Sequence, residues 1–94
     1  MPVSFDQRLT VPDNVLFREL EGESVILDLD SESYFGLDEV GTRIWQQVTE
    51  SATIEEAFAA LTREYDVEAD ELRADLYELL GTLLERGLLE VADA

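Results

Sequence analysis

VILDLDSESYFGLDEVGTRIW, residues 25–45, is the stretch that decides the fold. Its first part, residues 25–29, has the alternating pattern of a half-buried strand. Polar, turn-favouring residues follow at 30–33, and residues 34–37 resume an extended apolar run. Because the link is so short, the two runs should pair as neighbouring antiparallel strands. The stretch therefore predicts a β-hairpin.

The pattern changes from strand to helix at Asp38. An aspartate there can accept hydrogen bonds from the first free N–H groups of a helix. The residues that follow at helical spacing form an apolar stripe of Val40, Ile44, Trp45 and Val48. This stripe predicts a helix with one face packed on the hairpin. Trp45 is large enough to hold that helix on the sheet as a core residue.

Another strand is predicted before the hairpin, at residues 15–20. A compact turn follows at 21–23, where Gly22 can adopt a positive φ. Residues 1–14 predict a lead-in with a short extended piece. The three strands form a meander, and its first and third strands are open edges unless the lead-in covers one of them.

Two further helices are predicted after the first. Thr53 and Glu56 have the spacing of a capping box. The stripe behind it consists of Ile54, Ala57, Phe58, Leu61 and Tyr65. A third helix is expected at about 69–86, where Gly87 provides a left-handed cap and a short extended tail follows. Its wide apolar stripe consists of Leu72, Leu76, Leu79, Leu80, Leu83 and Leu84. The expected fold class is α+β, a winged-helix-like three-stranded antiparallel sheet followed by three helices.

Composition narrows the classes of function. The 94 residues, 46% hydrophobic, suit a single domain over residues 1–94, and the net charge is −17. All the basic residues are arginines, six in number, so the negative field should repel nucleic acid and anionic membranes. There is no cysteine or histidine, which argues against disulfides, the usual zinc sites and the commonest catalytic bases. We expect a cytoplasmic protein with no metal, no cofactor and no enzymatic activity.

The order of motifs resembles the PqqD-like family. The resemblance lies in a strand, a tight link, the strand Tyr34-Phe-Gly-Leu37, Asp38, and a helix that carries Gly-Thr and Trp45, and it extends over residues 15–91. Members bind leader peptides of ribosomally made, modified peptides, and the match is closest to the stand-alone recognition elements of lasso-peptide clusters. The resemblance implies a non-catalytic adaptor, or peptide chaperone. Such an adaptor binds the precursor's leader peptide and delivers it to a modifying enzyme or leader peptidase, with a cyclase as a further partner.

Two segments are the predicted peptide-binding site. The resemblance implies that the third strand accepts the leader as an added strand, through Ser33, Tyr34, Phe35, Gly36 and Leu37. It also implies a cleft between that strand and the third helix, with the contacts Leu72, Asp75, Leu76 and Leu79. The alternative for residues 33–37 is an ordinary core strand. The alternative for the third helix is that all of its leucines, Leu76 included, are core residues.

Other interpretations remain open at this stage. Asp28, Asp30 and Glu32 alternate like metal ligands, but they lack the glycine and terminal glutamate of a calcium loop, so a solvated turn is the alternative that we favour. A winged-helix regulator or an acidic DNA-mimicking antagonist would share the helical pattern, although the third helix carries only Arg73 and Arg86. An acyl-carrier-like protein would need an Asp-Ser-Leu attachment motif, which the sequence lacks.

Overall fold

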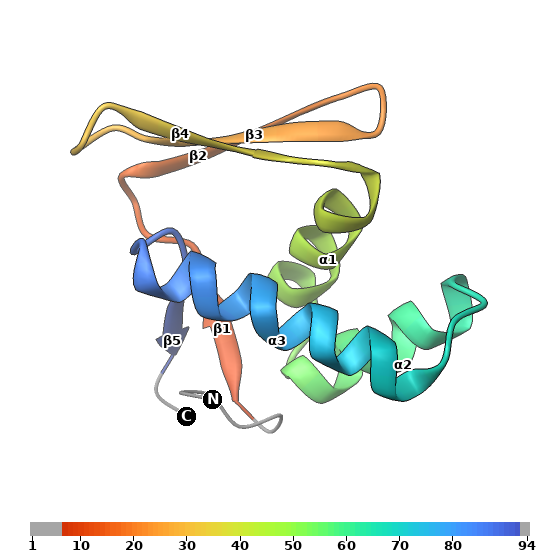
Figure 1. Cartoon of the computed structure of the whole chain (residues 1–94). Coiled ribbons are helices and arrows are strands. Elements are labelled where there is room, and N and C mark those ends of the chain that lie inside the picture. The colour runs from red at the N-terminus through yellow and green to blue at the C-terminus, as the bar shows by residue number, and fades with distance from the viewer. Residues whose placement is uncertain (1–6, 93–94) are drawn as a thin grey trace.

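The computed structural model describes residues 7–92 and contains two small sheets and three helices (Figure 1). In chain order the elements are β1 (Arg8–Thr10), β2 (Val15–Leu20), β3 (Glu23–Asp28), β4 (Ser33–Leu37), α1 (Glu39–Glu50), α2 (Ile54–Glu64), α3 (Ala69–Glu85) and β5 (Glu90–Ala92). The predicted α+β class, with a three-stranded antiparallel sheet followed by three helices, is confirmed.

The larger sheet has the strand order β2-β3-β4. Glu21 and Gly22 join the first two strands, and both have positive φ, 55° and 87°, as a tight two-residue hairpin turn requires. The second link, residues 29–32, also contains a residue with positive φ, Glu32. β3 and β4 pair from Ser24 opposite Leu37 to Asp28 opposite Ser33. The predicted hairpin is therefore present, in a fixed register.

The lead-in does not cover an edge of this sheet. Its extended piece, β1, pairs instead with β5 near the C-terminus, and Leu9 lies opposite Val91. Residues 1–6 of the predicted lead-in lie outside the described residues. Leu9 is buried in the core, which agrees with the pairing of β1 with β5 rather than with an edge strand of the larger sheet. Within residues 7–92, β2 and β4 both remain outer strands.

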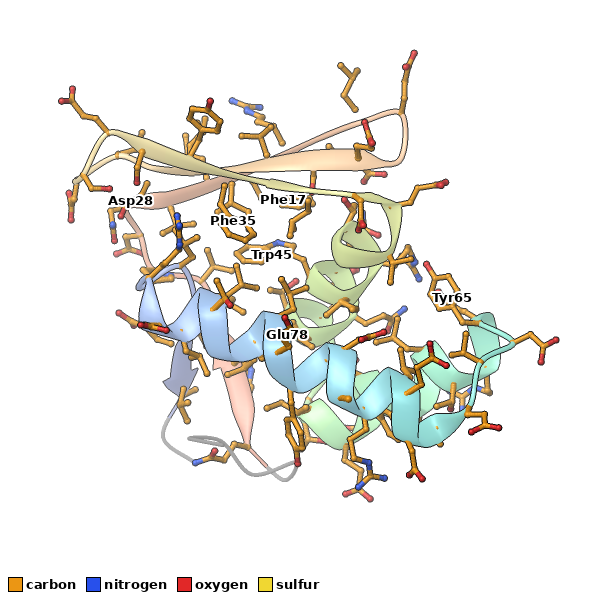
Figure 2. The ribbon with its side chains drawn as sticks, in the orientation of Figure 1. Phe17, Asp28, Phe35, Trp45, Tyr65 and Glu78 are labelled. Carbon is orange, nitrogen blue, oxygen red and sulfur yellow. The ribbon has the colours of Figure 1, made fainter. Side chains whose placement is uncertain are left out.

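α1 begins where the sequence predicts. The Asp38 carboxylate accepts a hydrogen bond from the Gly41 N–H at 2.8 Å. Phe17 and Phe35 point from the sheet toward Trp45, and the Phe17 and Trp45 rings stack with centroids 5.5 Å apart (Figure 2). Val40 departs from the predicted stripe. It is 41% exposed because it lies in the first turn of α1, at the rim of the sheet rather than beneath it.

The caps of the other two helices also follow the sequence. The Glu56 N–H donates to the Thr53 hydroxyl at the start of α2. α3 ends with Gly87 at φ 74°, where the Leu88 N–H donates to the Leu83 carbonyl and the Gly87 N–H donates to the Leu84 carbonyl. α3 passes under the sheet, and its C-terminal end lies below the β3–β4 link (Figure 1). Within residues 7–92 there is no helix with the length and hydropathy needed to cross a membrane.

Candidate functional site: the edge of β4 and its groove

β4 offers an open strand edge. Its only strand partner among residues 7–92 is β3, so one side of its backbone is unpaired. In an antiparallel ladder, every second residue directs its N–H and C=O away from the neighbouring strand. Ser33, Tyr34 and Gly36 are exposed, and a Cβ placed on Gly36 would meet nothing within 4 Å. The edge can therefore accept another extended backbone.

A groove of about 590 Å³ lies beside this edge. Its walls come from β4, the start of α1 and the middle of α3. The lining residues are Phe35, Gly36, Leu37, Asp38, Val40, Gly41, Ile44, Asp75 and Leu79. The groove is thus mainly apolar, and the two carboxylates, Asp38 and Asp75, give it a negative charge. This arrangement is suited to binding a peptide side chain that is apolar or basic.

Five of the predicted site residues line this groove: Phe35, Gly36, Leu37, Asp75 and Leu79. Ser33 and Tyr34 instead line a smaller hollow, of about 180 Å³, near the β3–β4 link. Tyr34 is 73% exposed, because its side chain and that of Phe35 point to opposite faces of the sheet. The structure thus brings both ends of β4 into contact with a surface hollow.

The assignment of Leu72 and Leu76 to the groove needs correction. Leu72 is 3% exposed and Leu76 is 0% exposed, and both belong to the core cluster. They lie on the side of α3 that packs into the core, whereas Leu79 is only partly buried. The flank of α3 that borders the groove is therefore defined by Asp75 and Leu79.

Sequence reasoning missed the contribution of α1. Val40, Gly41 and Ile44 line the groove, although the helical stripe placed Val40 and Ile44 in the core. The available signal was position: Val40 comes two residues after the N-cap Asp38, where the chain has just left β4. A residue there lies at the junction of sheet and helix, so it can reach a surface groove.

The smaller hollow has one basic side chain in its lining, that of Arg86. It is lined by Asp28, Ser31, Ser33, Tyr34, Phe35, Arg86 and Leu88. The Arg86 guanidinium carbon lies 5.1 Å from the centroid of the Phe35 ring, within the range of a cation–π contact. Asp28 Oδ1 accepts from Asn14 Nδ2 at 2.9 Å and from the Asp30 N–H at 3.1 Å. Hydrogen bonding by Ser31, and then by Asn14, lowers the pKa of Asp28.

The described residues contain no cluster suited to a metal ion, counting groups of three or more His, Cys, Asp or Glu between residues 7 and 92. Asp28 accepts hydrogen bonds from its own hairpin and from Asn14, which agrees with a structural role for this carboxylate. The chemistry that the groove offers is recognition, through a backbone edge, apolar walls and the carboxylates of Asp38 and Asp75.

Residues 23–89 match the model of the family PqqD, described as coenzyme PQQ synthesis protein D. The chain belongs to the PqqD family. A solved structure described as TbiB1 in complex with the TbiA(beta) leader peptide is similar to it, with 35% identity, a TM-score of 0.81, and coverage of 90% of this chain and 99% of that one. A second, lasso peptide synthetase B1 complexed with the leader peptide, has 23% identity, a TM-score of 0.78, and coverage of 88% and 98%, and supports the PqqD-like fold. No curated protein matches the chain.

Proposed function

We propose that the protein is a non-catalytic adaptor that binds the leader segment of a ribosomally made precursor peptide by strand addition at β4. The observation that carries this function is the open β4 edge beside an apolar groove. TbiB1, which shares 35% of its residues with this chain, is described in complex with a leader peptide. The comparisons offer no support for the winged-helix regulator or the DNA-mimicking antagonist.

Strand addition divides recognition between backbone and side chains. Hydrogen bonds from the β4 edge hold the leader whatever its sequence, and the groove selects among its side chains. Alternate side chains of a strand point to opposite faces, so every second leader residue would face Leu37, Val40 and Leu79. A leader with apolar residues at alternate positions fits this groove.

The adaptor acts with enzymes of lasso-peptide biosynthesis. It presents the bound precursor to a leader peptidase and to a cyclase, and residues 1–94 serve as one recognition domain in the cytoplasm. The absence of cysteine and histidine from the sequence supports a role without catalysis, because it removes thiolate nucleophiles and the commonest general base. When the adaptor also contacts the enzyme, the core peptide of the bound precursor is held close to that enzyme, which raises its effective concentration there.

The test uses a synthetic leader peptide of the cognate precursor, to be identified in the genome that encodes this chain. Fluorescence anisotropy measures its affinity, and mass spectrometry follows the peptide during long incubation with the pure protein. We expect saturable binding and an unchanged peptide mass. Either a lack of binding or a cleaved product would contradict the adaptor function.

A scan of the leader with N-methyl amino acids tests the binding mode. Each N-methyl group removes one backbone donor and leaves the side chain in place. We expect affinity to fall at every second position over about five residues, because only alternate N–H groups of an added strand face β4. Uniform effects along the leader would contradict strand addition.

A further inference from the structure

One side of α3 runs from an acid to a base along β4. Asp75, Leu79 and Arg86 are spaced i, i+4 and i+11, and four and eleven residues correspond to about one and three helical turns. The three side chains therefore lie on the same side of the helix. Asp75 and Leu79 line the groove with Leu37, and Arg86 lines the hollow with Ser33. α3 and β4 thus run in opposite directions beside each other.

The two ends of β4 consequently differ in charge. At its Leu37 end, Asp38 and Asp75 border the groove. At its Ser33 end, the hollow is lined by Arg86, one of six arginines in a chain with 23 acidic residues. It is also lined by Asp28, whose carboxylate already accepts hydrogen bonds from Asn14 and the Asp30 N–H. The one ion pair among residues 7–92 joins Arg43 to Glu64, so Arg86 has no carboxylate partner there. Its guanidinium lies over the Phe35 ring and can still donate hydrogen bonds to an incoming carboxylate.

The distance between Asp75 and Arg86 along α3 determines how many residues of a bound strand lie between them. Asp75 and Arg86 are eleven residues apart, which is about 16 Å along a helix that rises about 1.5 Å per residue. A strand rises about 3.3 Å per residue, so a bound strand would cover this distance in about five residues. Because alternate residues share a face, a spacing of four or six residues would place two leader side chains on the α3 side.

We propose that Asp75 and Arg86 select leaders by the order of their charges. This inference rests on the proposed strand addition at β4. The leader carries Lys or Arg next to Asp75, and Asp or Glu four or six residues later, next to Arg86. The order follows from an antiparallel arrangement, in keeping with the rest of the sheet, in which the leader enters at the Leu37 end of β4 and leaves at the Ser33 end.

The probes are versions of the synthetic leader that differ only in charge order. At the two ends of the segment that the N-methyl scan defines, one version has Lys first and Glu four residues later, and its partner has Glu first and Lys later. A second pair has a spacing of six. Within each pair the composition and net charge are identical, so steering by the overall charge of −17 cancels. We expect the Lys-first peptide to bind about three- to tenfold more tightly at low salt, at one or both spacings.

A charge-swapped protein provides the decisive comparison. The variant Asp75→Lys/Arg86→Glu keeps the net charge and should reverse the preference, so that the Glu-first peptide binds more tightly. The control Asp66→Lys/Arg63→Glu makes the same two kinds of change at exposed positions outside the groove, and should keep the original preference. Circular dichroism checks that both variants are folded.

The outcomes separate this inference from the proposed function. Equal affinities for both charge orders at both spacings, or a preference for Glu first in the unmodified protein, would overturn the charge selection while the adaptor function stands. An unchanged preference in the swapped, folded variant would overturn the roles of Asp75 and Arg86. A failure to bind the unaltered leader would instead overturn the adaptor function.

Discussion

The hydroxyl oxygens of Ser24 and Thr42 lie 2.8 Å apart in a buried hydrogen bond that joins β3 to α1. Within residues 7–92 these are the two buried polar residues. Ser24 lies opposite Leu37 in the sheet, so the bond fixes α1 close to the end of β4 where the groove begins. A polar contact in the core thereby helps to position the proposed peptide site.

Ser24→Ala should lower the free energy of unfolding by about 1–3 kcal/mol, because it leaves the buried Thr42 hydroxyl without its partner. The double variant Ser24→Ala/Thr42→Val should lose less than the sum of the two single changes, since it removes both polar groups. Urea denaturation measures these values. Ser31→Ala, which removes the exposed side-chain hydrogen bonds of Ser31 to Ser33 and Asp28, should change stability little. Strict additivity in the cycle would contradict a coupled pair.

Leu79→Asp and Leu76→Asp should have opposite consequences. At Leu79 the new carboxylate lies in the groove, so leader affinity should fall by at least about 2 kcal/mol, roughly 30-fold, with a small change in the thermal midpoint. At Leu76, which is fully buried, the same charge should unfold the domain. Anisotropy and thermal denaturation are measured on both variants. A folded Leu79→Asp protein with unchanged affinity would place the site elsewhere.

Gly36→Pro should abolish leader binding. Proline removes the N–H of this β4 residue and fixes its φ, which interferes with backbone pairing at the strand. Gly36→Ala is the matched control for folding, because the added Cβ meets nothing within 4 Å. Thermal denaturation shows whether the proline also weakens the β3–β4 hairpin. A stably folded Gly36→Pro protein with normal affinity would contradict binding at this strand.

Salt should slow the association with a leader that carries Lys or Arg. The net charge of −17 attracts such a peptide, and ions screen this attraction over about 10 Å near 0.1 M salt. Stopped-flow fluorescence measures the association rate constant from low to high salt. A leader variant in which the basic residues are replaced by glutamine should show much weaker dependence on salt. A flat response with the basic leader would mean that apolar and backbone contacts dominate.

The contact between α1 and α2 should weaken in acid. Hydrogen bonding by Arg43 lowers the pKa of Glu64 below its usual value of 4.5. The unfolded chain then binds this proton more readily, so the stabilisation is present above pH 4.5 and is lost as the pH falls through the lower, folded pKa. The pair is partly exposed, so its contribution at pH 7 should be below about 1 kcal/mol.

Urea denaturation of the protein and of Glu64→Gln between pH 7 and pH 3 isolates this effect. The difference in unfolding free energy between the two proteins should shrink toward zero on acidification. Taking the difference removes the general relief of repulsion as the other carboxylates become protonated. A difference that stays constant or grows as the pH falls would contradict the role of the pair.

Most features that depend on a few neighbouring residues could be predicted from the sequence. The turn at Gly22, the N-caps Asp38 and Thr53, and the Gly87 cap each satisfy backbone groups within about five residues. The hairpin is equally local, because a link of four residues leaves its two runs little choice of partner. The motif order that identified the PqqD family is built from these same short elements.

Side-chain placement within the elements needed the tertiary structure. Six leucines on α3 make a stripe so wide that periodicity alone cannot distinguish Leu76, which the core surrounds, from Leu79, which borders the groove. Val40 fits the helical stripe of α1 but lies at the surface, because the angle at which α1 leaves β4 decides which side of its first turn the sheet covers.

Contacts between distant parts of the chain were decided by packing alone. The sequence determined that residues near each terminus are extended, but not that β1 pairs with β5, because many partners satisfy a short strand and only the shape of the helical core brings these two together. The same holds for Arg86 over Phe35, about fifty residues apart in the chain. Where α3 lies relative to β4 is set by burial of its leucines. This placement puts Asp75 in the groove near the Leu37 end of β4 and Arg86 in the hollow near the Ser33 end.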